Sequence, residues 1–265
     1  YSSLSEENIY ALINNFPVQI ICLEKMDNTL DYLLNDEEDN DKTESLNSRE
    51  WASCLFQIIM TLITYQKIFD FTHNDLHTNN IMYQKTERTF INYKYNNVYY
   101  RVPTYGKIYK IIDFGRAIYS FNGKTICSDS YHPKGDAATQ YNFEPYFNEN
   151  KPRLKPNKSF DLCRLACSLY DFFVDDIENE KKIKNPIAKL IIKWTKDDKN
   201  RNILYKNNGE ERYPDFKLYK MIVRTVHNHI PEVQLTNPIF SKYKSSKKKI
   251  KKGKIINIDN MESMI

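Results

Sequence analysis

Apolar residues recur with helical spacing along much of the chain. The clearest series begins at Trp51 and ends at Tyr65, and the preceding pair Asn47 and Glu50 has the spacing of an N-terminal capping box. This series predicts a long amphipathic helix that begins near Asn47. The same spacing predicts three later helices, which begin near Ser159, Pro186 and Pro214.

Short segments rich in Tyr, Ile and Val interrupt the helical pattern. Residues 88–95, 97–102 and 107–112 are separated by an Asn-Asn pair and by a turn at 103–106. This arrangement predicts a small antiparallel insert at about 84–107. The expected fold class is therefore α+β, mostly helical, with a small β insert.

The pattern near the N-terminus is less regular. The apolar run from Val18 to Leu23 predicts a buried strand, and short helices are expected after Ser5 and over 29–34. The polar, acidic residues 35–44 predict a loop between the second of these helices and the long one.

The formal charge of +5 is concentrated near the C-terminus, where eight lysines lie between Lys242 and Lys254. Subtracting them from 39 basic residues leaves 31 against 34 acidic ones, so the rest of the chain is mildly acidic. That balance gives no broad basic surface for a polyanion. We expect 241–265 to be a basic, disordered tail, with localisation or nucleic-acid binding as the alternative role.

Five scattered cysteines, most of them in apolar surroundings, indicate reduced core residues of an intracellular protein. Cys163 and Cys167 have helical spacing, which favours two residues on one packed face over a metal site. The sequence has no run of eighteen apolar residues and no charged-then-apolar signal at its start. We therefore expect neither secretion nor membrane insertion.

Two segments carry residues that suit phosphoryl transfer. The first, HNDLHTNNIMY, spans 73–83 after the long predicted helix; the second, KIIDFGRA, spans 110–117 at the end of a predicted strand. They contain Asp75, Asn80 and Asp113 on short loops. One carboxylate can orient an attacking hydroxyl and accept its proton, while an Asp and an Asn can hold Mg²⁺ against nucleotide phosphates.

The order H-x-D-L-x-x-x-x-N and then D-F-G resembles the catalytic and magnesium loops of the protein-kinase-like superfamily. The chain looks most like protein kinases of giant DNA viruses, over about residues 18–230. The resemblance implies a kinase-like fold that uses ATP and Mg²⁺. It implies Asp75 as the catalytic base, and Asn80 and Asp113 as metal ligands. His73 would pack beneath the magnesium loop, and a buried Asp161 would hold the catalytic-loop backbone.

The resemblance also locates the nucleotide and divides the chain. Residues 18–26 resemble the last N-lobe strand and the hinge of a kinase, so Glu24, Met26 and Asp27 would contact the nucleotide. The expected parts are an N-lobe remnant at 1–26, a C-lobe at 27–240 and the tail at 241–265. No Gly-rich loop and no lysine of the V-A-I-K type precede the hinge, and the chain begins with Tyr1. We therefore expect an N-terminally incomplete kinase.

The sequence departs from the kinase pattern at positions that bear on regulation by phosphorylation and on the molecule that accepts the phosphate. Asn74 stands in place of the usual Arg, which removes the cation that reads activation-loop phosphorylation. His77 stands in place of the Lys that contacts the transferred phosphate, as in haspin-like kinases and aminoglycoside and choline phosphotransferases. Its imidazole could still donate to the phosphate during catalysis, with less charge than an ammonium. No A-P-E triplet follows; the nearest segment has Glu144 before Pro145.

The leading hypothesis is a Ser/Thr protein kinase whose partner is a protein substrate. A kinase for a small-molecule acceptor is an alternative because of His77, and an inactive scaffold is another because the N-lobe motifs are missing. A metal-hydrolase cluster of His73, Asp75 and His77 is a further hypothesis, but it leaves Asn80 and the D-F-G unexplained. We expect neither a nucleic-acid partner, with the Lys-rich tail as the one exception to consider, nor a membrane partner. We expect an intracellular location, in the host cytoplasm if the source is viral.

Overall fold

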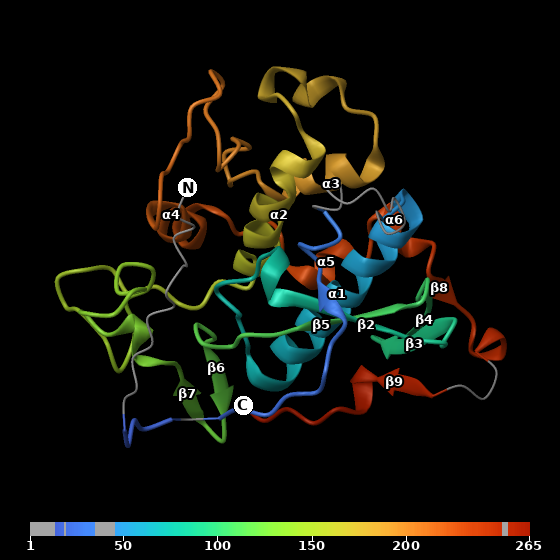
Figure 1. The fold of residues 1–265 in the computed structure, drawn as a ribbon, viewed down its shortest axis with the longest axis horizontal. Coiled ribbons are helices and arrows are strands. Elements are labelled where there is room, and N and C mark those ends of the chain that lie inside the picture. The colour runs from blue at the N-terminus through green and yellow to red at the C-terminus, as the bar shows by residue number, and fades with distance from the viewer. Residues whose placement is uncertain (1–13, 19, 35–45, 251–253) are drawn as a thin grey trace, which may run out of the picture.

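Helix α1 (Ser48–Phe69) runs through the middle of a mixed α+β fold (Figure 1). The structure is a computed structural model that describes residues 14–18, 20–34, 46–250 and 254–265. The predicted capping box is confirmed: the Asn47 side chain accepts from the backbone N–H of Arg49 and Glu50. The Glu50 carboxylate in turn accepts from the N–H of Asn47 at 2.8 Å. These reciprocal bonds fix the residue at which α1 begins.

Aromatic side chains pack against α1 near its N-terminal end. Trp51 contacts Phe172 and Phe173 at the end of α2 (Phe160–Phe173), with ring centroids 5.9 and 5.2 Å apart. Further along α1, Phe56 packs against four rings of the β insert and the C-terminal segment, namely Tyr93, Tyr100, Phe240 and Tyr243. One continuous core therefore joins α1 to elements at both ends of the sequence.

A three-stranded antiparallel sheet carries the ends of both motif segments. Its strands are β1 (Asn28–Thr29), β2 (Ile81–Lys85) and β5 (Lys107–Ile111), in the order β1-β2-β5. Ile81 pairs with Ile111, so the first residue of β2 lies opposite the last residue of β5. The loop residues that precede β2 and follow β5 are therefore close in space.

The predicted insert is confirmed as a hairpin of β3 (Phe90–Tyr95) and β4 (Val98–Pro103). Asn96 and Asn97 form its two-residue turn with φ of 48° and 58°. Asparagine tolerates this left-handed conformation better than most residues, which explains why an Asn-Asn pair ends the strand pattern here.

The expectation of a disordered tail is wrong for the part of 241–265 that the structure describes. β8 (Lys244–Ser245) pairs with β4, and β9 (Ile255–Asn257) pairs in parallel with β3, giving a four-stranded sheet in the order β8-β4-β3-β9. Ile250 and Ile258 are buried, at 6% and 0% exposure. Lysines dominate the composition, but the isoleucines between them provide the apolar contacts that hold this segment on the fold.

The predicted later helices are confirmed as α2, α3 (Pro186–Trp194) and α4 (Lys217–Thr225). Two short helices, α5 (Pro231–Gln234) and α6 (Pro238–Ser241), follow. A separate hairpin comprises β6 (Tyr119–Phe121) and β7 (Lys124–Ile126). The 3₁₀ turns are η1 (Thr78–Asn80), η2 (Asp129–Tyr131), η3 (Ile177–Lys182), η4 (Lys247–Lys249) and η5 (Ile258–Asn260).

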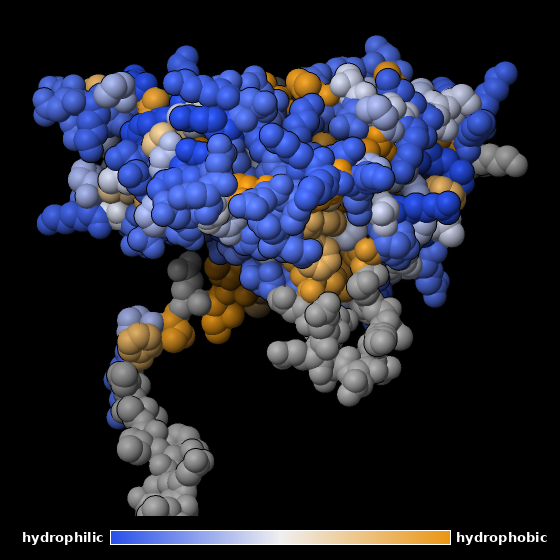
Figure 2. Space-filling model, turned by 90° about the horizontal axis from the view of Figure 1, so that it is seen from above, coloured by the Kyte–Doolittle hydropathy of each residue, from blue (hydrophilic) through white to orange (hydrophobic). Residues whose placement is uncertain are grey.

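The described residues before β1 contradict the predicted buried strand. They form no strand, and Val18, Ile20 and Leu23 are 75%, 80% and 76% exposed. Figure 2 shows apolar side chains that project from the body of the molecule on this extended segment. A strand forms only where a neighbour offers backbone hydrogen bonds, and within the described residues this apolar run has no such neighbour.

The expected short helix over 29–34 is also wrong, because Asn28 and Thr29 form β1 and residues 30–34 form turns. The described part of 1–26 is therefore no folded remnant of a lobe. The helix expected after Ser5 and the acidic loop expected over 35–44 lie outside the described residues.

Three of the five cysteines are core residues, as predicted. Cys54, Cys163 and Cys167 are buried and free, burial raises the pKa of Cys163 well above its usual value, and Cys127 is half-buried. Cys22 is exposed, so its apolar sequence neighbours misled the expectation of a core residue. Helix α1 is long and apolar enough to cross a membrane, but 67% of its most apolar window is buried inside the fold. This degree of burial is typical of a helix in the core of a folded domain.

Candidate functional site

The loop between α1 and β2 is anchored by Asp161 in the first turn of α2. The two carboxylate oxygens of Asp161 accept the backbone N–H groups of His73 and Asn74, both at 2.9 Å. Asp161 is fully buried, and this burial raises its pKa, while His73 and the two N–H groups act in the opposite direction. The paired bonds fix the path of the backbone just before Asp75.

Asn74 connects this loop to two other segments. Its φ of 63° lies in the left-handed region that asparagine tolerates. Its amide nitrogen donates to the backbone oxygen of Arg116 at 3.2 Å, and its amide oxygen accepts the hydroxyl proton of Tyr141 at 2.9 Å. Asn74 is fully buried. This position thus holds a neutral side chain that links the two motif loops.

Asn80 and Asp113 lie at the same end of the β2–β5 ladder. The Asn80 amide nitrogen donates to the backbone oxygen of Asp75 at 2.9 Å, which leaves its amide oxygen as the atom that could hold a cation. The backbone N–H of Ile112, next to Asp113, donates to the Asn80 carbonyl at 3.0 Å. Asp113 is exposed, with φ of 58°. An amide oxygen and a carboxylate on adjacent loops are hard ligands of the kind Mg²⁺ prefers.

Both oxygens of the Asp75 carboxylate have partners. The Tyr219 hydroxyl donates to Oδ1 at 2.6 Å, and Nη1 of Arg116 lies 3.3 Å from Oδ2. The Asp75 side chain is 20% exposed. Tyr219 comes from α4, where its ring stacks on Phe216 at 10° with centroids 5.1 Å apart. The carboxylate predicted to receive a proton is therefore already bound to a hydroxyl group.

A second guanidinium lies against the tyrosine that binds this carboxylate. Arg164 on α2 lies over the Tyr219 ring at 5.0 Å, and its Nε is buried without a hydrogen-bond partner among the described residues. Burial lowers the pKa of His77, and the charge of Arg164 lowers it further, against the opposing effect of Asp75. The lowered pKa of His77 disfavours a charged imidazole, while Arg116 provides positive charge beside Asp75 and Arg164 provides it beside Tyr219.

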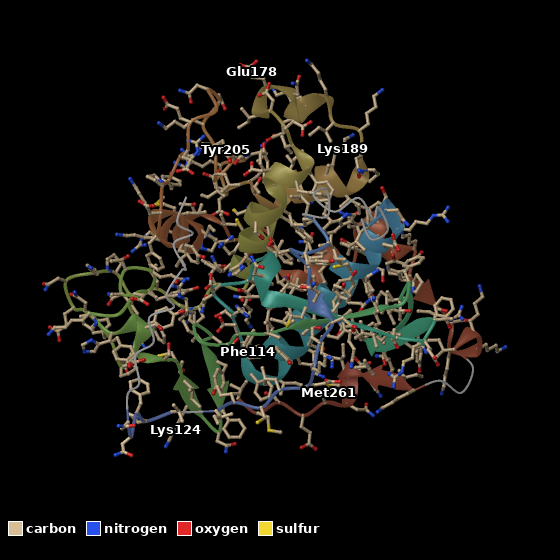
Figure 3. The ribbon with its side chains drawn as sticks, in the orientation of Figure 1. Phe114, Lys124, Glu178, Lys189, Tyr205 and Met261 are labelled. Carbon is tan, nitrogen blue, oxygen red and sulfur yellow. The ribbon has the colours of Figure 1, made fainter. Side chains whose placement is uncertain are left out.

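His73 and Phe114 form the apolar support of the site. Phe114 packs against Tyr65 of α1, Phe71 and His73, with centroids 6.2, 5.8 and 5.7 Å apart. It remains 45% exposed, and Figure 3 shows it between α1 and β6. The expectation that His73 packs beneath the second motif loop agrees with these contacts and with the 2.8 Å contact from its Nε2 to the carbonyl of Ile112.

The same contacts weaken the metal-hydrolase hypothesis. Both ring nitrogens of His73 are engaged, because Nδ1 also lies 3.3 Å from the backbone nitrogen of Asp75. Within the described residues, no group of three or more His, Cys, Asp or Glu side chains could hold a metal ion. Asn80 and Asp113 offer one carboxylate and one amide. Mg²⁺ at this pair would rely on phosphate oxygens and water for its other ligands.

The three residues expected at the nucleotide lie along the edge of the β1-β2-β5 sheet. Glu24 is paired with Lys110 of β5, which lowers the pKa of the exposed Glu24 carboxyl. Asp27 donates its backbone N–H to the carbonyl of Tyr83 at 3.0 Å, and its carboxylate accepts the N–H of Lys85 at 2.7 Å. Met26 is half-buried between them. Glu24 and Asp27 thus contact β5 and β2, the two strands beside whose ends Asp113 and Asn80 lie.

Sequence reasoning missed three residues of this site. Tyr219 lies on the helix predicted after Pro214, 144 residues from Asp75 in sequence, and the helical spacing marks it only as an apolar position. Arg164 occupies a helix whose spacing indicates a core face. Arg116 follows the D-F-G directly, and that adjacency is the one signal that could have identified it.

A scan against known protein families finds no match to this chain. The chain is similar to the Uncharacterized protein 098R of Invertebrate iridescent virus 6, with 30% identity over 178 residues. The match covers 66% of this chain and 26% of that protein. The chain therefore spans about a quarter of the length of the viral relative that it matches.

Proposed function

We propose that this chain contains the catalytic centre of an ATP-dependent phosphotransferase with a protein-kinase-like fold. The acceptor in this proposal is a Ser or Thr hydroxyl of a protein. The observation that carries the proposal is the shared position of Asp75, Asn80 and Asp113. They belong to two loops at one end of the β2–β5 ladder, joined by the bond from Asn80 to the Asp75 carbonyl and by that from Ile112 to Asn80.

Each residue has a distinct chemical role in this proposal. Asp75 accepts the acceptor's proton while the hydroxyl oxygen bonds to the γ-phosphorus, the bond to the β–γ bridging oxygen breaks, and ADP leaves. Asn80 and Asp113 would hold Mg²⁺, which supplies positive charge against the phosphate oxygens. Asp161 fixes the backbone before Asp75 through its two 2.9 Å bonds and so acts as a positioning residue.

Positively charged groups around Asp75 would stabilise the negative charge of a transferred phosphate. Burial and the charge of Arg164 lower the pKa of His77, but Arg116 lies beside the carboxylate and Arg164 beside its tyrosine partner. Guanidinium groups bind phosphate oxygens in a planar, paired geometry. In this proposal, they take the place of the loop lysine that the kinase pattern has where this chain has His77.

An inactive scaffold is the second candidate, because both Asp75 oxygens are engaged by Tyr219 and Arg116. Transfer of radiolabel from [γ-³²P]ATP, with Mg²⁺ and a mixture of Ser- and Thr-containing proteins, distinguishes the two. Asp75→Asn removes the base while keeping the shape of the side chain. Asp175→Asn makes the same change on an exposed residue outside the site and serves as the matched control.

The proposal predicts that Asp75→Asn lowers the transfer rate by about 10²- to 10⁴-fold, the usual contribution of a general base. The Asp175→Asn control should keep the wild-type rate. Equal rates for Asp75→Asn and wild type would reject Asp75 as the base. Nucleotide binding without transfer by the wild-type protein would favour the scaffold, and transfer to a metabolite but to no protein would favour a small-molecule kinase.

A further inference from the structure

A pocket of about 590 Å³ lies where the C-terminal segment meets the β3–β4 hairpin. Arg88 and Arg101 line it from the hairpin, and Lys249 and Lys254 line it from the C-terminal segment. We call the surface formed by these four residues the basic groove. It belongs to the part of Figure 1 in which β3, β4, β8 and β9 come together.

Among the described residues, no acidic group compensates the charge of the basic groove. The described residues that line the pocket include no acid, and all four cations are exposed. In the part of the chain that the structure describes, none of the four forms an ion pair. Four like charges around one hollow repel one another and concentrate anions from solution.

The remaining lining suits more than a bare anion. Phe90 lies in the pocket wall with the guanidinium of Arg101 at 3.4 Å from its ring centroid, and Ile250 and Ile256 add apolar surface. Asn92, only 9% exposed, also lines the pocket, and its amide oxygen has no hydrogen-bond donor among the described residues. A ligand that combines phosphates with a flat ring would use the cations and the apolar wall together.

We infer that the basic groove binds single-stranded nucleic acid. Phosphodiester groups bind Arg88, Lys249 and Lys254, and a base lies against the Phe90 side of the pocket. The pocket volume of about 590 Å³ is within the range that holds a compact organic ligand. In a duplex the bases are paired and stacked inside, so they would not reach this wall. A single strand presents bases and backbone at once.

The inference is independent of the phosphotransferase proposal, because no residue of the basic groove belongs to the loops around Asp75. It also changes the expectation for the Lys-rich segment. The described lysines of that segment do not act from a free tail: β8 and β9 pair with β4 and β3, and this pairing brings Lys249 and Lys254 beside Arg88 and Arg101.

Fluorescence anisotropy of a labelled oligothymidylate of about twelve residues tests the inference on the full chain, across a salt series. The test variant is Lys249→Gln with Lys254→Gln. The matched control is Lys124→Gln with Lys189→Gln, which removes the same charge from two exposed lysines. Figure 3 shows Lys124 on β7 and Lys189 on α3, both away from the β3–β9 region.

Removing two phosphate contacts should weaken binding roughly tenfold near 0.15 M salt and lower the slope of log affinity against log salt by about 1.4. The control pair should bind like wild type. Phe90→Leu should weaken binding roughly tenfold without changing the salt slope, because it removes stacking and no charge. This second variant separates recognition of the base from attraction of the backbone.

Several results would overturn the inference. Equal losses in the control pair would mean that net charge alone attracts the strand. Equal affinity for heparin, or for duplex DNA of the same length, would assign the groove to polyanions in general. Binding of a free mononucleotide as tightly as the oligonucleotide would assign it to a small ligand, and no binding by wild type at about 50 mM salt would reject the site altogether.

Discussion

The hydrogen bond between Tyr219 and Asp75 can be removed by a substitution that deletes a single oxygen atom. Tyr219→Phe deletes the hydroxyl that donates to Asp75 Oδ1 at 2.6 Å and keeps the ring. The stacking on Phe216 should persist, since it involves the ring face. The substitution therefore separates the loss of the hydroxyl from the packing of α4.

The size of the effect follows from the type of bond. A hydrogen bond to a charged group contributes about 1.5–3 kcal/mol, and the lower end applies here because the Asp75 carboxylate is 20% exposed. An acceptor hydroxyl must replace this bond before it can give its proton to Asp75. Without the tyrosine hydroxyl, that cost disappears, and kcat/KM should rise about tenfold, the equivalent of roughly 1.4 kcal/mol.

Burial and the bond to Asp75 raise the pKa of Tyr219, although Arg164 lowers it, so the phenol stays protonated at neutral pH. The rise in kcat/KM should therefore be the same from pH 6 to pH 8. The assay is transfer of the γ-phosphate of ATP to a protein acceptor. Stability should be measured in parallel by urea unfolding, since the lost bond costs folding free energy as well.

Tyr205→Phe is the matched control. Tyr205 donates its hydroxyl proton to the Asp171 carboxylate at 3.0 Å, and Figure 3 shows it away from Phe114 and the loops beside it. It should change stability to a similar or smaller extent and leave the transfer rate unchanged. A fall in kcat/KM for Tyr219→Phe, with Tyr205→Phe unchanged, would show that Tyr219 holds Asp75 in place and would refute the reasoning.

Three further predictions concern stability. Asp161→Asn leaves one oxygen for two backbone N–H groups, so the free energy of unfolding should fall by about 2–4 kcal/mol in urea titrations, and a loss below about 1 kcal/mol would contradict the anchor. Asp259 accepts the N–H groups of Asn96 and Asn97 at 2.7 and 3.1 Å, so Asp259→Asn should speed amide exchange in β9 without altering α1. Burial lowers the pKa of His229, even though its bond to a carbonyl opposes this. The unfolded chain then binds the proton more readily, so stability is complete above about pH 6.5 and falls as the pH drops below it; His229→Gln should remove this part of the loss.

The regular elements were predictable because their signals are local. The capping box at Asn47 and Glu50 and the Asn96-Asn97 turn both act over a few residues, and each fixed an element boundary correctly. The motif loops were predictable for the same reason, since Asp75 and Asn80 are separated by a single short turn.

The errors come from interactions that act over long distances in sequence. The apolar run before β1 has strand composition, but a strand depends on a neighbour, and the described residues offer none. The Lys-rich segment looked disordered because its lysines outnumber the isoleucines that become buried when the segment pairs with β3 and β4. Tyr219 reaches Asp75 only because α4 packs beside α2, and no local pattern encodes that approach.

The central claim is that Asn80 and Asp113 hold the divalent cation of a bound nucleotide. Mn²⁺ can replace Mg²⁺, and its unpaired electrons broaden the NMR signals of nearby nuclei. With Mn²⁺ and a non-hydrolysable ATP analogue, the account predicts selective loss of the signals of Asn80 and of residues 112–115, dependent on the nucleotide and abolished by Asp113→Asn. The claim would be contradicted by broadening that occurs equally without the nucleotide, that persists in Asp113→Asn, or that affects only residues near other carboxylates.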